Sequence, residues 1–238
     1  MGTVILLRHA KSAANGSGIL AGRSAGVELD DSGRQQAQGL VERLSTVPLA
    51  AIVSSPMLRC EQTLQPLSKD RALDPVVEPD LAEVDYGSWT GKKLSDLVEE
   101  PLWRVVQAHP SAAAFPDGEG LANVQARAVA AVRKHDERVT ASAGEHAVWL
   151  LCSHGDVLKS IIADALGQHL DAFQRIVVNP GSISVVRYTP LRPFLLRLND
   201  DGDDLSGLAP PPEEKAAEGE AGDAARSSDA AVGGDPGA

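Results

Sequence analysis

The sequence lacks the segments that are typical of membrane-spanning and exported proteins. No apolar run approaches the roughly 18 residues that a transmembrane helix needs. No basic and then apolar leader precedes the first apolar run. Only two cysteines, Cys60 and Cys152, occur in 238 residues, which is too few for a disulfide framework. These absences favour a protein of the reducing cytoplasm that has no membrane partner.

A basic surface excess is missing as well, although the charge is very unevenly distributed. The net charge is −11, and residues 200–238 carry −9 of it, with eleven Asp or Glu against two Lys or Arg. This tail has no aromatic and few aliphatic residues, so it buries too little apolar surface to offset its ordering entropy. We therefore predict one folded domain over 1–199 and a disordered acidic tail over 200–238. The nearly neutral body and acidic tail argue against a nucleic-acid partner.

Short apolar runs alternate with stretches of helical periodicity. The runs at 4–7, 50–53 and 147–151 are bounded by turn residues and predict buried parallel strands. Strands that alternate with helices indicate an α/β fold with a mostly parallel sheet. Further predicted elements are helices from 32, 56, 121 and 156, weak helix over 94–108, and strands at 76–77, 183–186 and 194–198.

Two helix starts and four histidines allow more local predictions. Ser32, followed by Gln35, predicts the N-cap of the first long helix, and Ser55 before Pro56 predicts the N-cap of the second. The polar and turn contexts of four further histidines predict surface positions for His109, His135, His146 and His169. Cys152, at the end of a buried strand, is expected to be a small core residue.

Basic side chains follow three of the predicted strands. Arg8 and His9 follow the first strand, Arg59 lies in the first turn of the helix after the second, and His154 follows the strand at 147–151. Ligands of parallel sheets bind beyond the carboxyl ends of the strands. Two imidazoles and two guanidinium groups at one edge predict a site for a dense anion, most simply phosphate.

These residue types suit phosphoryl transfer. A neutral imidazole can attack phosphorus and form a covalent phosphohistidine, and cationic neighbours disfavour protonation of such a ring. The leaving oxygen needs a proton, for which Glu83 is the candidate, because a carboxyl group beside a dianion has a raised pKa. Asp85 and Glu119 are alternatives for that role.

Four linked motifs occur along the chain: Leu7-Arg8-His9-Ala10-Lys11-Ser12, Ser54-Ser55-Pro56-Met57-Leu58-Arg59, Leu81-Ala82-Glu83 with Tyr86-Gly87, and Ser153-His154-Gly155. Together they resemble the histidine phosphatase superfamily, which includes cofactor-dependent phosphoglycerate mutases, over about residues 3–188. The resemblance implies a three-layer α/β/α fold with a mostly parallel central sheet, as in the mutases. It also implies that His9 is the nucleophile, that Arg8, Arg59 and His154 form the phosphate pocket, and that Glu83 is the proton donor. Asn15, Gly22 and Gly155 complete the expected substrate site.

Departures from the family pattern favour water as the phosphoryl acceptor. Ala10 and Lys11 replace the usual Gly-Glu, and Val84 stands where the mutases that the chain resembles carry Arg. The segment Phe115-Pro116-Asp117-Gly118-Glu119-Gly120 is similar to the phosphatase branch. We therefore predict a phosphatase for small-molecule phosphate monoesters. A mutase and a non-catalytic phospho-ligand binding module remain alternatives.

Other phosphate chemistries fit the sequence less well. No Gly-x4-Gly-Lys-Ser/Thr loop is present, which argues against an NTPase. Gly22-Arg23-Ser24-Ala25-Gly26 matches a serine hydrolase motif, but it does not follow a predicted strand. The residues near 154–156 lack enough neighbouring ligands for a metal site. We expect an enzyme that needs neither metal nor cofactor.

Overall fold

The computed structural model describes residues 1–202. Its strands are β1 (Thr3–Arg8), β2 (Leu49–Ser54), β3 (Val76–Val77), β4 (Val148–Ser153), β5 (Ile183–Arg187) and β6 (Phe194–Asp200). Its α-helices are α1 (Ala13–Ser17), α2 (Asp31–Arg43), α3 (Leu58–Arg71), α4 (Leu94–Leu97), α5 (Pro101–Ala108), α6 (Leu121–Ala143) and α7 (Gly155–Ala165). Short 3-10 turns lie at Pro79–Leu81, Gly87–Trp89, Pro110–Ala112 and Leu170–Arg175.

The strands described in residues 1–202 form one sheet in the order β3-β2-β4-β1-β5-β6. The pairs β3-β2, β2-β4 and β4-β1 are parallel, whereas β5 pairs antiparallel with both β1 and β6. Parallel pairing needs a long crossover, which the intervening helices provide. The predicted α/β fold with a mostly parallel sheet is confirmed, and so is the predicted pair of strands at the end of the domain.

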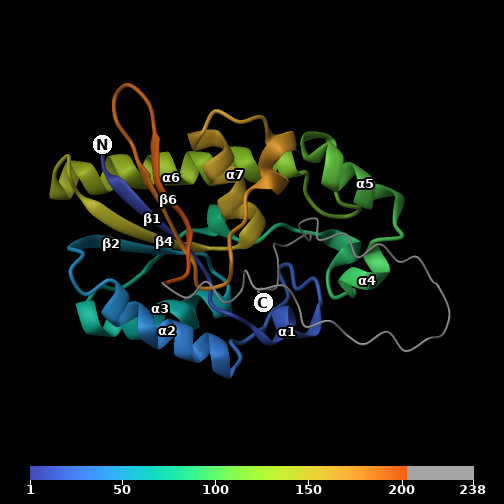
Figure 1. Ribbon diagram of the computed structural model, residues 1–238, viewed down its shortest axis with the longest axis horizontal. Helices are drawn as coiled ribbons and strands as arrows, with labels where there is room; N and C mark the ends of the chain where they lie inside the picture. The colour runs from blue at the N-terminus through green and yellow to red at the C-terminus, as the bar shows by residue number, and fades with distance from the viewer. Residues whose placement is uncertain (203–238) are drawn as a thin grey trace, which may run out of the picture.

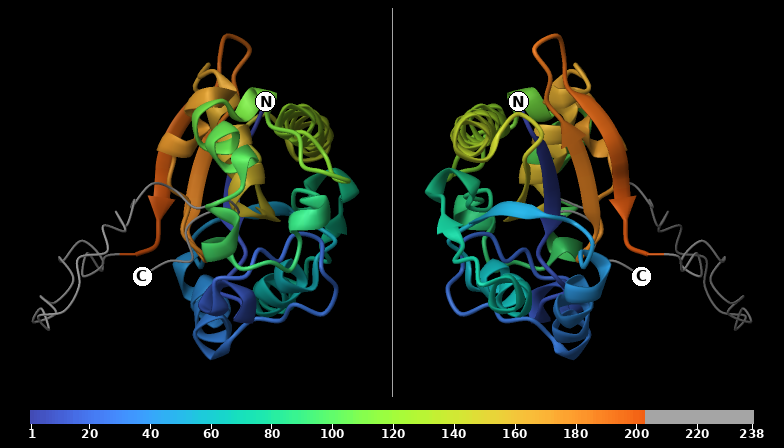
Figure 2. Two further views of the ribbon diagram at one scale, coloured as in Figure 1. Left: turned by 90° about the vertical axis from the view of Figure 1, so that its right-hand side faces the viewer. Right: turned by 90° about the vertical axis from the view of Figure 1, so that its left-hand side faces the viewer.

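Helices cover both faces of the sheet. On β1, Ile5 and Leu7 belong to the core shared with α2 and α3, while Val4 and Leu6 belong to the core shared with α6 and α7. Figure 1 shows these two helix pairs on opposite sides of the strands, and Figure 2 shows α6 end-on with β6 along the opposite side of the molecule. Because the central strands are buried on both faces, their sequences are continuous apolar runs rather than alternating ones.

Two helix starts differ from the predictions. Asp30, rather than Ser32, is the N-cap of α2, and its carboxylate accepts from the Gly33 N–H at 2.7 Å. Helix α3 begins at Leu58 after Met57, with no side-chain cap, because the Ser55 hydroxyl is used elsewhere. A short capped helix, α1, also lies within the loop expected over 10–31.

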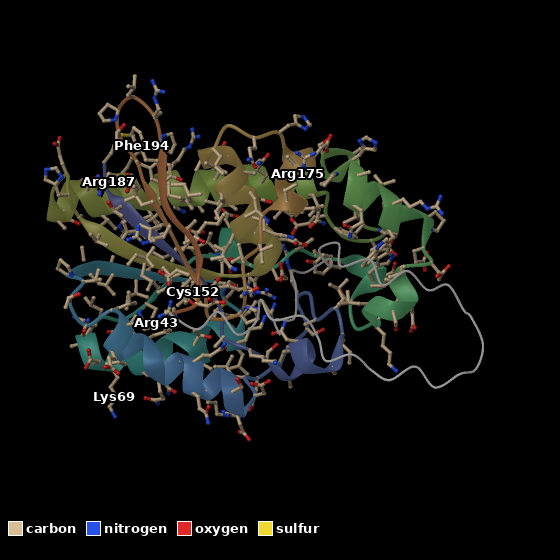
Figure 3. All side chains as sticks on the ribbon, in the orientation of Figure 1. Arg43, Lys69, Cys152, Arg175, Arg187 and Phe194 are labelled. Carbon is tan, nitrogen blue, oxygen red and sulfur yellow. The ribbon has the colours of Figure 1, made fainter. Side chains whose placement is uncertain are left out.

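One histidine prediction is wrong. His135 is buried, and its Nε2 lies 2.8 Å from a Glu78 carboxylate oxygen, whereas the other three surface histidines are exposed as predicted. Cys152 is a buried core residue, and Figure 3 places it in the middle of the molecule, with Lys69 at the periphery.

Across residues 1–202, none of the helices has the length and apolar character that crossing a bilayer requires. The predicted acidic tail lies outside the described residues apart from its first three positions, and β6 ends at Asp200.

Candidate active site

The carboxyl ends of three neighbouring parallel strands bring the predicted basic residues together. The backbone N–H of His9 donates to the Ser153 carbonyl at 2.9 Å, and that of Ser55 donates to the Cys152 carbonyl at 2.9 Å. These bonds extend the strand pairing past the strand ends, so the loops leave the sheet at fixed positions. The rings of His9 and His154 then lie with their centroids 5.2 Å apart.

His9 presents one ring nitrogen with a free electron pair. Its Nδ1 lies 2.8 Å from the Ala10 carbonyl oxygen, which can only accept, so Nδ1 carries the proton. Nε2 is then the unprotonated nitrogen, and it accepts from Arg59 Nε–H at 3.3 Å. Burial, followed by the charges of Arg59 and Arg8, holds the pKa of His9 well below its ordinary value of 6.5. A neutral imidazole whose unprotonated nitrogen accepts only one long hydrogen bond is a competent nucleophile.

The two arginines are held by backbone carbonyls. Arg8 Nη1 donates to the Val178 carbonyl at 2.7 Å, and Arg59 Nη2 donates to the Gly22 carbonyl at 3.0 Å. Both side chains are nearly inaccessible to solvent. Among residues 1–202, Arg59 Nη1 has no hydrogen-bond partner, although it is buried. A buried guanidinium with an unused donor is expected to have an anionic ligand.

Ser55 fixes the second imidazole. Its hydroxyl oxygen lies 2.7 Å from His154 Nε2 and accepts weakly from the Met57 N–H at 3.4 Å. The hydroxyl can donate to an unprotonated His154 Nε2, and in that tautomer the ring proton lies on Nδ1. Within the described residues Nδ1 has no hydrogen-bond partner, and it lies 3.8 Å from Glu83 Oε2. Burial and the charge of Arg59 keep the pKa of His154 well below 6.5, so the ring is neutral near pH 7.

Glu83 is the buried carboxyl group of the site. Its Oε1 accepts from the Val84 N–H at 2.9 Å, and its Oε2 lies 3.9 Å from Arg59 Nη2. Burial raises the pKa of Glu83 to about 7; the nearby Asp156 charge also raises it, whereas Arg59 opposes the shift. A carboxyl group that gains and loses its proton near neutral pH suits general acid and base catalysis.

The alternative carboxylates, Asp85 and Glu119, are engaged elsewhere. Glu119 accepts from Arg23 at 2.8 Å and from Arg127 at 2.7 Å, and Asp85 lies 3.8 Å from Arg23. The same two arginines donate to the Glu83 backbone carbonyl, at 2.8 and 3.3 Å. The cluster therefore fixes the loop that carries Glu83, and of the three acids Glu83 alone lines the cavity at this edge of the sheet.

The cavity has a volume of about 420 Å³, including open solvent at its mouth. Of the predicted site residues, those that line it are His9, Asn15, Gly22, Arg59 and Glu83. The ring of His154 is in contact with that of His9, but His154, Arg8 and Gly155 do not line the cavity; Gly155 is instead the buried first residue of α7.

Asn15 and Gly22 also shape the wall. Asn15 forms a capping box with Ser12 at the start of α1. Gly22 has a φ of +50°, and a Cβ atom there would lie 2.9 Å from Thr90 Oγ1. The sequence patterns do not identify Ser55, Arg23 or Arg127 as parts of the site, because their roles depend on contacts between segments far apart in the chain.

The sequence of this chain is similar to those of known proteins. The sequence pattern of the histidine phosphatase superfamily, branch 1, matches residues 4–201. Phosphoserine phosphatase 1 of Hydrogenobacter thermophilus is 30% identical over 199 residues, which cover 82% of this chain and 91% of that protein. A Proteus mirabilis protein with the name "Probable phosphoglycerate mutase GpmB" is 29% identical over 188 residues, which cover 78% of this chain and 84% of that protein.

Solved structures with the same fold include members described as follows. YhfR of Bacillus stearothermophilus is 26% identical, with a TM-score of 0.76 over 84% of this chain and 98% of that structure. The alpha-ribazole phosphatase of Shigella flexneri, at 24% identity, shares the fold with a TM-score of 0.74 over 85% of this chain and 98% of that structure. The resemblance predicted from the four sequence motifs is confirmed, and the chain belongs to the histidine phosphatase superfamily, branch 1.

Proposed function

We propose that this enzyme hydrolyses small-molecule phosphate monoesters through a phosphohistidine on His9. One observation carries the proposal: the unprotonated Nε2 of His9 shares a cavity with Glu83, a carboxyl group whose pKa is about 7. An unprotonated nucleophile and a proton donor for the leaving group are the two groups that ester cleavage requires. The names of the phosphoserine phosphatase and alpha-ribazole phosphatase relatives also support phosphatase activity.

The proposed reaction has two steps. His9 Nε2 attacks phosphorus, the bond from phosphorus to the ester oxygen breaks, and the protonated Glu83 gives its proton to the departing alcohol. Glu83, now ionised, takes a proton from a water molecule, whose oxygen attacks phosphorus and releases inorganic phosphate from His9. Arg8, Arg59 and His154 Nδ1–H stabilise the charge on the phosphoryl oxygens in both steps.

This scheme needs no metal, because guanidinium groups supply the charge stabilisation and His9 is the nucleophile. No cluster of three His, Cys, Asp or Glu side chains suited to a metal occurs within residues 1–202. We also propose that 1–199 is the catalytic domain, a choice supported by the family match to 4–201, and that the cytoplasm is its compartment.

Product analysis tests the activity. We expect a chromogenic aryl phosphate to release equal amounts of inorganic phosphate and the phenol, with activity unchanged by chelators. The mutase alternative, favoured by the GpmB relative, predicts instead the interconversion of phosphoglycerate isomers on addition of a bisphosphoglycerate primer. A binding module would leave every ester intact while still binding phosphate.

A further inference from the structure

The wall of the cavity beyond the phosphate-binding groups is uncharged. It is formed by the neutral polar residues Ser12, Asn15 and Tyr86, by Ala14, and by two paired segments, one with Gly18, Ile19, Leu20 and Ala21 and the other ending in Leu94. The pairing is fixed by an antiparallel bridge between Ile19 and Lys93 and by the Leu94 N–H, which donates to the Gly18 carbonyl at 2.9 Å. Figure 1 shows α1 and α4, which flank these segments, at the same end of the molecule.

Lys11, Lys92 and Lys93 neighbour this wall in the chain, but the described lining of the cavity includes none of them. Arg23 is paired with Glu119 and Asp85, and Lys92 lies 3.9 Å from Glu100. Among the described residues that line the cavity, Arg59 is the single Lys or Arg, and Arg59 faces His9, at the phosphate end. A second negative charge on a substrate would therefore meet Ile19, Leu20 and Leu94 rather than a cation.

We infer that the enzyme selects phosphate monoesters of uncharged, partly apolar alcohols and discriminates against esters whose alcohol carries a carboxylate. The inference rests on the proposed function, since it assigns the leaving-group side of the same site. Carboxylate desolvation against an apolar wall without a compensating partner is unfavourable. Apolar carbons of the alcohol gain contact with the same wall.

A matched pair of esters tests the selectivity. Glycerol 3-phosphate and 3-phosphoglycerate differ in a hydroxymethyl group against a carboxylate and have similar leaving oxygens. We expect kcat/KM to be at least about tenfold higher for glycerol 3-phosphate, from a desolvation cost of this order. Equal or faster hydrolysis of 3-phosphoglycerate would overturn the inference.

A charge placed in the wall provides the second arm. Leu94 is partly exposed at the mouth, so Leu94→Arg puts a guanidinium beside the expected carboxylate, and Leu94→Gln is the neutral control. The readout is the ratio of kcat/KM for 3-phosphoglycerate to that for glycerol 3-phosphate. We expect Leu94→Arg to raise this ratio about two- to fivefold, as a partly solvated ion pair does, and Leu94→Gln to leave it unmoved. An equal change of this ratio in both variants would contradict the claim that this wall faces the alcohol part of the substrate.

Binding separates this inference from the proposed hydrolysis. His9→Ala removes the nucleophile, and calorimetry of both esters with that variant then measures affinity without turnover. Tighter binding of glycerol 3-phosphate by His9→Ala supports the selectivity, and it does so even if the wild-type chain hydrolyses neither ester, a result that would refute the proposed hydrolysis alone. Tighter binding of 3-phosphoglycerate would refute the selectivity whether or not the wild-type enzyme turns over.

Discussion

Replacement of Glu83 by Gln removes the exchangeable proton of the site while keeping the shape of the side chain. The amide oxygen of Gln can still accept from the Val84 N–H, as Glu83 Oε1 does at 2.9 Å. At its ordinary pKa of 4.5 a carboxyl group is about 0.3% protonated at pH 7, whereas at a pKa of about 7 it is about half protonated. Burial therefore increases the fraction of competent acid by roughly two orders of magnitude.

Esters with different leaving groups separate the two roles of Glu83. For an alkyl phosphate, whose alkoxide needs a proton, we expect Glu83→Gln to lower kcat/KM by about a hundredfold or more, the usual contribution of a general acid. For p-nitrophenyl phosphate, whose phenolate leaves without a proton, the first step survives and the second loses its base. The variant should therefore release a burst of p-nitrophenolate equal to the enzyme concentration and then stall.

The pH dependence follows with a definite sign. The acid form of wild-type Glu83 is lost as pH rises through about 7, so kcat/KM for the alkyl ester should fall there, and Glu83→Gln should lack that limb. Burial of this group also costs stability: the raised pKa makes the free energy of unfolding fall by about 3 kcal/mol between pH 4.5 and 7, and Gln should abolish that loss. An equal loss of kcat/KM for both esters in Glu83→Gln, with no burst, would refute the assignment of Glu83 as the general acid and base.

Three shorter predictions concern the neighbours of the nucleophile. Ser55→Ala should lower kcat/KM by about tenfold and Ser55→Thr should restore it, because the hydroxyl sets the His154 tautomer; a kcat/KM that stays low in Ser55→Thr would contradict this role of the hydroxyl. Gly22→Ala should lower the free energy of unfolding by about 1 to 2 kcal/mol in urea titrations, since its φ of +50° and its contact with Thr90 both disfavour a Cβ; an unchanged midpoint would contradict this. The depressed pKa values of His9 and His154 mean that the unfolded chain binds more protons at these two sites below pH 6.5, so their contribution to stability, which opposes that of Glu83, should fall from that pH downwards; the stability of His9→Ala relative to wild type should therefore rise as the pH is lowered.

The fold could be predicted from the sequence because its strands are buried on both faces. The runs around Ile5, Ile52 and Leu150 are apolar throughout, and the residues that follow parallel strands must meet at one edge. That reasoning places His9 and His154 together without knowledge of any loop. Their chemical roles, with those of Arg8, Arg59 and Glu83, stay predictions until they are measured.

Features that depend on tertiary contacts were not predictable. Ser55 looks locally like an N-cap, but its hydroxyl has a buried partner in His154, and that bond replaces the cap. His135 looks like a surface residue of a polar helix, but α6 turns it towards Glu78, which follows β3. The loop over 10–31 contains α1 and the cavity wall, and neither follows from periodicity, since the segment is short and rich in glycine.

The most direct test of the mechanism is detection of the phosphoryl group on the enzyme. Rapid mixing with a labelled ester, followed by an alkaline quench and peptide mapping, should recover an acid-labile, alkali-stable phosphate on His9, more of it in Glu83→Gln and none in His9→Ala. Turnover of the ester with no label on His9, or undiminished turnover by His9→Ala, would contradict the proposed covalent mechanism.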